Sequence, residues 1–490
     1  MPNQYRPPSP WLRFALGLVV ASSVVVAVAG SCASAAAQQA PSPPAPSAIE
    51  PGRWSGGLDF GQGREELDLR ILPTGGLLDL PGQRLYGYPL SSIHVDGKRI
   101  GFSLFEGQPD EAAGQGAGGA DGDAAGGAGG GAAGGGSPLV FSGELGADKN
   151  GEPRIEGRVT RDGLVGGSFD LAPSPLRPGP GESAYVVDTG RGLLPGTLLL
   201  PEGEGPFPVV LILAGAGTTD RDGNNYAVPG KNDALKYLAQ ALRDRGVASL
   251  RYDKRGAGES YALVPTEASL RFDDYVSDAA AALVALRSDG RFSRVVVAGH
   301  TEGALVASGA LLDAGAKSAD GLALLCASGK SAAETVEAAV AGAPPELKKE
   351  GAAILKAIRA GTIYPAPSPY FSDFFRPSFQ PYLASWFRHD LKAELRGLKV
   401  PVLLVQGNRD FQTTLAEFDI LVRARPDAAA FVLPDMNHAL KKVSPDLDEN
   451  YRAFTDPSFP LAPELPDLLA AFAKGESLPD QAYRYRPAKH

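Results

Sequence analysis

The segment that decides the fold is Val295-Val296-Val297-Ala298-Gly299-His300-Thr301-Glu302-Gly303-Ala304-Leu305-Val306-Ala307. Its first four residues form an apolar run, which predicts a buried strand, and its last four begin an apolar helical pattern. The two glycines between them allow the backbone to turn sharply without Cβ clashes. Strand, tight turn and helix in this order are the context of the G-x-S-x-G turn, whose central hydroxyl projects beside the first amides of a helix.

The turn from Gly299 to Gly303 is called the elbow below. Its central residue is Thr301, whereas the G-x-S-x-G pattern has serine at that position. A β-branched residue at such a backbone position adds strain, and its methyl group crowds the attacking oxygen. Threonine can nevertheless act as a nucleophile. Ser328 and Ser331 do not replace it, because they follow the next predicted strand. The pentad alone also fits an ordinary strand-to-helix turn, so the partners of Thr301 decide its interpretation.

An elbow nucleophile needs an acid and then a histidine further along the chain. Of the five histidines, only His438 follows the predicted strand 400–405 within a segment that looks folded. Asp410 lies in the loop after that strand, at the sheet edge where α/β active sites collect. It would hold the His438 imidazole in the required tautomer. A helix N-cap or surface carboxylate is the alternative for Asp410 alone, but its spacing from His438 favours the pair.

A second oxyanion donor is expected from the loop after the strand 208–213. That loop begins Ala214-Gly215-Ala216-Gly217, and small residues let backbone N–H groups approach a substrate oxygen. The predicted oxyanion hole therefore uses the N–H groups of Ala216 and Glu302. A phosphate-binding loop is the competing interpretation, but the glycine patterns of such loops are absent. No cofactor is required, and no cluster has the spacing of a metal site.

These stretches together resemble the α/β-hydrolase superfamily, in its bacterial esterase or serine-aminopeptidase-like branch. The resemblance covers about residues 183–475 and includes the segments 250–260 and 380–387. It implies a mostly parallel sheet with helices on both faces and a cap at about 330–398. It further implies hydrolysis of a small-molecule carboxylic ester by Thr301, His438 and Asp410. A peptidase or amidase with the same machinery, and a catalytically silent binding protein, are the alternatives.

The pattern along the chain predicts two folded domains. Residues 51–173 contain short alternating runs typical of antiparallel sheets, interrupted at 107–137 by a Gly/Ala-rich insert that we expect to be flexible. From about 183, strands alternate with helices, as in a parallel sheet. The predicted strands are 209–213, 247–251, 294–298 and 321–325, and the helices are 232–245, 272–288, 302–314 and 346–360. The aromatic residues of the cap either line an acyl pocket or pack onto the sheet.

The N-terminus resembles an export signal. Residues 1–37 hold Arg6, Arg13 and an apolar stretch followed by small residues, and 38–50 read as a disordered tether. Cleavage before Cys32 would give a lipoprotein attached to the membrane, whereas cleavage after an A-x-A pattern would give a soluble periplasmic or cell-surface protein. An uncleaved anchor is the third alternative. A net charge of −9 argues against nucleic acid as the main partner. The partner of the β-rich domain is not indicated.

Overall fold

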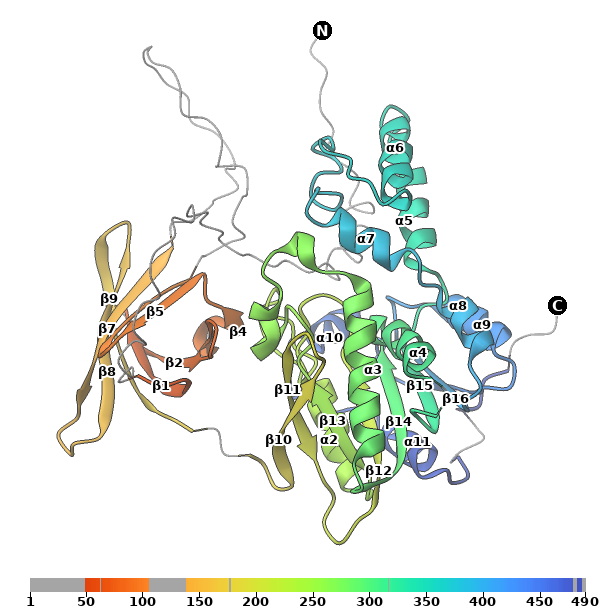
Figure 1. Ribbon diagram of the computed structural model, residues 1–490, viewed down its shortest axis with the longest axis horizontal. Helices are drawn as coiled ribbons and strands as arrows, with labels where there is room; N and C mark the ends of the chain where they lie inside the picture. Colours follow the sequence, from red (N-terminus) through yellow and green to blue (C-terminus); the bar gives the residue numbers. More distant parts are fainter. Residues whose placement is uncertain are drawn as a thin grey trace. The chain divides into compact units, whose positions relative to one another are not determined.

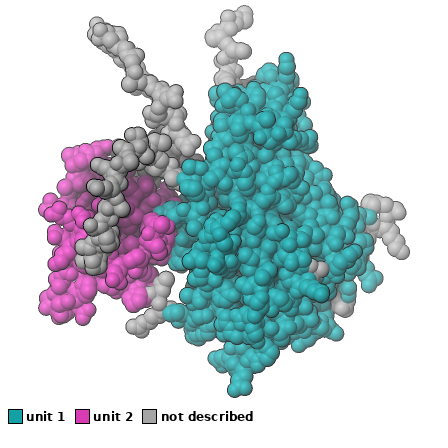
Figure 2. Space-filling view, viewed as in Figure 1, with its two compact units in different colours: residues 1–26, 177–490 teal, residues 27–176 magenta. Residues whose placement is uncertain are grey.

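The computed structural model describes residues 49–61, 63–104, 138–175, 178–315, 317–478 and 483–486. The predicted signal, the tether, Cys32 and the Gly/Ala-rich insert lie outside these ranges. The chain divides between residues 176 and 177 into two compact units (Figure 2). Among the described residues, every helix is too short or too polar to cross a bilayer.

The N-terminal unit is a nine-stranded sheet in which all neighbouring strands are antiparallel, as predicted. Its strand order is β4-β3-β2-β1-β9-β8-β7-β6-β5. Phe102 and Phe141 stack in its core, and Phe169 meets both rings edge-on. The strands are β1 (Gly52–Asp59), β2 (Arg64–Ile71), β3 (Gly76–Leu80), β4 (Leu85–Pro89), β5 (Ser92–Asp96), β6 (Arg99–Leu104), β7 (Leu139–Ala147), β8 (Pro153–Arg161) and β9 (Leu164–Pro173).

The C-terminal unit is built on an eight-stranded sheet with the order β10-β11-β13-β12-β14-β15-β16-β17 (Figure 1). Strand β11 pairs antiparallel with both β10 and β13. From β13 to β17, all neighbouring strands in the sheet are parallel. This mixed sheet confirms the predicted α/β class, although β10 and β11 were not predicted as strands. The strands are β10 (Glu182–Asp188), β11 (Leu193–Leu199), β12 (Phe207–Leu213), β13 (Ala248–Tyr252), β14 (Phe292–His300), β15 (Gly321–Leu325), β16 (Val402–Gly407) and β17 (Ala429–Leu433).

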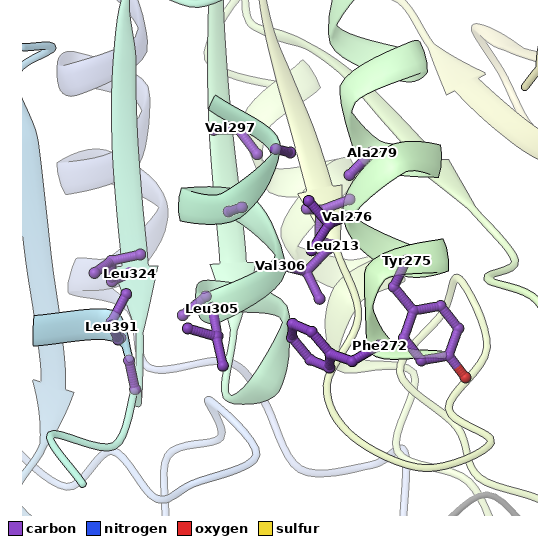
Figure 3. Packing of buried hydrophobic residues seen from close by; sticks show 14 of the residues in the cluster. Leu213, Phe272, Tyr275, Val276, Ala279, Val297, Leu305, Val306, Leu324 and Leu391 are labelled. Carbon is purple, nitrogen blue, oxygen red and sulfur yellow. The ribbon is translucent and has the colours of Figure 1, made fainter. Parts of the chain in front are cut away.

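Helices cover both faces of this sheet, and β14 shows why the sequence requires it. Val295 and Val297 belong to the core shared with α3 and α4 (Figure 3). Val296 and Ala298 belong to the core shared with α2 and α11. A strand apolar on both faces must be covered twice. The helices outside the insertion are α2 (Ala234–Arg243), α3 (Phe272–Ser288), α4 (Glu302–Ala314), α9 (Leu415–Ala424), α10 (Leu447–Arg452) and α11 (Glu464–Lys474).

An insertion between β15 and β16 matches the expected position of the cap. It contains α5 (Ala332–Ala341), α6 (Lys348–Arg359), α7 (Gln380–Trp386) and α8 (Leu391–Gly397). Most of its aromatic residues pack against one another, with ring contacts along the series Phe371, Phe375, Phe374, Phe379 and Tyr382. The four phenylalanines are almost completely buried, and Phe371, Phe374 and Phe375 also line a small cavity within the cap.

Candidate active site

The elbow lies at the carboxyl end of β14, and Thr301 has φ 53° and ψ −115°. A β-branched residue with positive φ is strained, as the sequence predicted. Close backbone packing makes both flanking glycines necessary. A Cβ on Gly299 would lie 2.2 Å from the Gly303 carbonyl oxygen, and one on Gly303 would lie 2.6 Å from the Leu213 carbonyl oxygen. The elbow is thus pressed between the start of α4 and the end of β12.

Asp410 and His438 are brought into direct contact. The Nδ1 atom of His438 lies 2.8 Å from Oδ2 of Asp410, whose side chain is fully buried. The same carboxylate accepts hydrogen bonds from the Gln406 amide at 2.9 Å and from the backbone N–H groups of Gln412 and Thr413 at 2.8 Å. Burial acts to raise the pKa of Asp410, but His438 and the backbone N–H groups of Thr413 and Gln412 outweigh it and hold the pKa below its usual value. The carboxylate is therefore ionised and orients Nδ1–H.

The N-cap alternative for Asp410 does not hold. Helix α9 begins at Leu415, and its N-cap is Thr414, whose hydroxyl accepts a hydrogen bond from the Glu417 N–H. Asp410 lies upstream, in the loop between β16 and α9. Its backbone contacts are those of an Asx turn, which fixes the direction of the carboxylate.

The elbow and the histidine loop are joined through His300. Its Nε2 atom lies 2.7 Å from the carbonyl oxygen of His438, and since a carbonyl only accepts, Nε2 carries the proton. Burial, with a smaller contribution from His438, lowers the pKa of His300 to about 4. The ring is therefore neutral near pH 7. Among the described residues, the Thr301 hydroxyl makes no hydrogen bond to His438, so the link between the elbow and His438 runs through His300.

The predicted oxyanion loop lies against the elbow. A Cβ added to Gly215 would be 2.5 Å from Thr301 Oγ1, so only glycine leaves room for the hydroxyl. The loop is anchored further along by Arg221, which pairs with the buried Asp253 carboxylate at 2.7 Å. Asp253 also accepts the N–H of Arg221 at 2.8 Å. Of the two predicted donors, Glu302 directly follows Thr301, and Ala216 directly follows the Gly215 that packs against the Thr301 hydroxyl.

A buried cluster beside the elbow was missed by the sequence analysis. The Lys254 ammonium donates to the carbonyl of Gly215 and lies 3.7 Å from a Glu302 carboxylate oxygen. The Tyr382 hydroxyl, from the cap helix α7, lies 3.3 Å from the other oxygen of Glu302. Lys254 is within the segment 250–260 that carries the family resemblance, but no spacing in the sequence indicates its contacts.

Cys326 is buried one position after the end of β15, with φ 52°. Its sulfur and the ligand atoms of Asp410 and His438 lie within 4.8 Å of one another. Sequence spacing could not reveal this cluster, because Cys326 is distant from both in the chain. Burial, and then the neighbouring Asp410, raise the pKa of the Cys326 thiol well above its usual value. Within this cluster, Asp410 and His438 contact each other directly at 2.8 Å.

Parts of this chain are similar to known proteins. Residues 230–360 match the family described as serine aminopeptidase, S33. The chain is 28% identical over 279 residues to the esterase EstD of Thermotoga maritima, an alignment that covers 53% of this chain and 61% of that protein. The chain therefore spans less than two thirds of the length of this relative.

Solved structures with similar folds include two esterases. Est1E from Butyrivibrio proteoclasticus has 14% identity and a TM-score of 0.38, with coverage of 60% of this chain and 96% of that one. The esterase EaEST from Exiguobacterium antarcticum has 17% identity and a TM-score of 0.37, with coverage of 60% and 100%. The fold assignment itself rests on the strand order and connections of the C-terminal unit.

Proposed function

We propose that the C-terminal unit of this chain is a hydrolase of small-molecule carboxylic esters, with Thr301 as nucleophile, His438 as general base and Asp410 as the orienting acid. One observation carries the proposal. The buried, ionised Asp410 lies 2.8 Å from His438, and His438 is tied to the elbow through the 2.7 Å contact of His300. An ionised acid that orients a histidine, linked to the turn that carries a hydroxyl, supports the assignment of a hydrolytic triad.

The reaction would follow from these placements. Thr301 Oγ1 attacks the ester carbonyl carbon, and its proton passes to His438 Nε2. The carbonyl oxygen becomes an oxyanion, held by the N–H groups of Ala216 and Glu302. Collapse releases the alcohol, which takes the proton from His438. Water, activated by the same histidine, then cleaves the Thr301 acyl ester and releases the acid.

Cleavage of an amide substrate is the first alternative. The family match favours an amine leaving group, and the relative favours an alcohol leaving group. The matched family is described as a serine aminopeptidase, whereas the relative is an esterase. We assign ester cleavage because the esterase match covers more of the chain. Hydrolysis of a short p-nitrophenyl ester and of an aminoacyl p-nitroanilide by the same preparation separates the two. Faster cleavage of the anilide would overturn the ester assignment.

A silent binding protein is the second alternative, favoured by the methyl group of Thr301. Thr301→Ser distinguishes the two, because it removes that methyl and keeps the hydroxyl. An active site predicts higher turnover in Thr301→Ser and a loss on the order of 10³-fold or more in both Thr301→Ala and His438→Ala, since nucleophile and base act together. The matched control is Thr362→Ala, at the end of α6, whose hydroxyl bonds only the nearby carbonyl of Ala357. Equal ester hydrolysis by wild type and Thr301→Ala would contradict the mechanism.

A further inference from the structure

Lys254 occupies an unusual position for a lysine. Its side chain is 10% exposed, and its ammonium donates to the Gly215 carbonyl and lies 3.7 Å from Glu302 Oε1. The ammonium also lies 5.1 Å from the centre of the Tyr275 ring. A buried ammonium costs free energy unless it is paired and hydrogen-bonded, and this one has both kinds of partner.

The contact with Gly215 bears on the next residue. The peptide between Gly215 and Ala216 is trans, since Gly205-Pro206 is the only cis peptide among the described residues. In a planar trans peptide the carbonyl oxygen and the following N–H point in opposite directions. A cation on the Gly215 oxygen therefore fixes the direction of the Ala216 N–H. It also polarises the peptide, because hydrogen bonds on the two sides of one amide strengthen each other.

The contact with Glu302 bears on the second donor. Glu302 is the first residue of α4, and its side chain is 5% exposed. Lys254 holds one carboxylate oxygen and Tyr382 the other. The residue that carries the second N–H is thereby fixed through its own side chain. Lys254 thus contacts both Gly215 and Glu302 through its ammonium group.

We propose that Lys254 is a positioning residue of the oxyanion hole, which fixes the peptide that carries the Ala216 N–H and the residue that carries the Glu302 N–H. This inference rests on the proposed hydrolytic function, and it adds a residue that acts through the donors and does not touch the substrate. It also explains why a carboxylate is tolerated next to a developing oxyanion: the Lys254 ammonium compensates its charge.

The charges of the pair support this arrangement. Burial lowers the pKa of Lys254, and Glu302 opposes the shift. Burial likewise raises the pKa of Glu302, and Lys254 opposes that shift. Each group is thus the main electrostatic support of the other. Removing the lysine alone would leave an uncompensated carboxylate at the oxyanion site.

The test is the Lys254→Met variant of the full chain, with p-nitrophenyl butyrate as substrate. Loss of a direct oxyanion donor costs about 10²- to 10³-fold in kcat, so an indirect support should cost about 10- to 100-fold, with KM changed by less than about threefold. The trifluoromethyl ketone analogue of the ester, which places an oxyanion in the same hole, should lose affinity by the factor lost in kcat/KM. A residue with only a structural role would not produce this correlation.

Arg425→Met is the matched control. Arg425 is a buried cation that also holds backbone carbonyls, those of Leu395, Leu398 and Val400, which lie outside the loops of the site. The Arg425→Met substitution should lower the melting temperature and leave kcat of the folded protein unchanged. If Lys254→Met does not fold, Lys254→Gln serves in its place, since it removes the charge and keeps a polar head.

The outcomes separate this inference from the proposed function. Suppose that a folded Lys254 variant keeps the full kcat, while Thr301→Ala loses the activity of the wild type. This result would overturn the role of Lys254 and leave the proposed function intact. A rise in KM without loss of kcat would do the same. A wild-type protein that hydrolyses the ester no better than Thr301→Ala would overturn the proposed function, and the oxyanion role of Lys254 with it.

Discussion

The Nε2–H group of His300 donates a hydrogen bond to the main-chain carbonyl of His438 over 2.7 Å. The residue before the proposed nucleophile thus holds the backbone of the proposed base. The contact joins the β14–α4 turn to the loop after β17, which are otherwise separate in the chain. Breaking this hydrogen bond should therefore lower both the stability of the fold and the activity of the site.

The first prediction concerns His300. Burial lowers its pKa to about 4 in the folded state, against about 6.5 in the unfolded chain. Its contribution to stability is therefore present above pH 6.5 and is lost as the pH falls toward 4, by up to about 3 kcal/mol. His300→Gln keeps a donor but does not titrate. Urea unfolding from pH 4 to 7 should show wild type gaining stability relative to His300→Gln as the pH rises. A pH-independent difference would contradict the assignment.

The second prediction has the opposite sign and concerns His389. Burial acts to lower its pKa, but hydrogen bonds to Glu394 and Asp273 outweigh it and raise the pKa. Its contribution to stability is therefore full below the unfolded value near 6.5 and is lost as the pH rises through the raised folded value. Arg388 also pairs with Asp273. His389→Gln should reduce stability more at pH 5 than at pH 9, as measured by urea unfolding.

The third prediction concerns Asp410. Asp410→Asn keeps the size of the side chain but removes the charge that orients His438 Nδ1–H, so kcat should fall on the order of 10³-fold with little change in KM. Asp435→Asn is the matched control, because Asp435 pairs with Arg409 and lies in the neighbouring loop. A loss of the same size in both variants would point to a general effect on these loops and would contradict a specific role for Asp410.

The fourth prediction concerns export. We propose that Cys32, which lies outside the described residues, is lipidated and retains the protein at the membrane. Metabolic labelling with a fatty-acid analogue should label wild type and not Cys32→Ser, although Cys326 remains in both. A soluble, unlabelled mature protein that begins after Ala35 or Ala37 would contradict lipidation.

The elbow and the order of strands and helices could be predicted because their signals are local. The apolar run Val295 to Ala298 and the following glycines determine strand, turn and helix without reference to the rest of the chain. Helices α3 and α4 were predicted at Phe272–Ser288 and Glu302–Ala314, as observed. The pairing of Asp410 with His438 was also predicted, because the chain order of a triad restricts the choice of histidine. The predicted catalytic roles of these residues stay predictions.

Contacts that join distant segments could not be predicted in this way. Lys254 meets Glu302 only because β13 and β14 flank β12 in the sheet, and Tyr382 reaches Glu302 only because α7 folds back onto α3. Strand β14 extends to His300, beyond the predicted end at Ala298, because Gly299 and His300 pair with Leu324 and Leu325. Such pairings depend on the partner strand, which no local pattern describes.

The central claim is that the Thr301 hydroxyl is the nucleophile, and one measurement tests it most directly. Purified wild-type protein is treated with a fluorophosphonate probe, digested, and the adduct is located by mass spectrometry. In the wild type we predict one adduct, on Thr301. In Thr301→Ser the adduct at position 301 should form faster. No adduct should form in Thr301→Ala, or in protein with Asp410 and His438 both replaced by alanine. Ester hydrolysis accompanied by an adduct on any other residue, such as Ser328, would contradict the account.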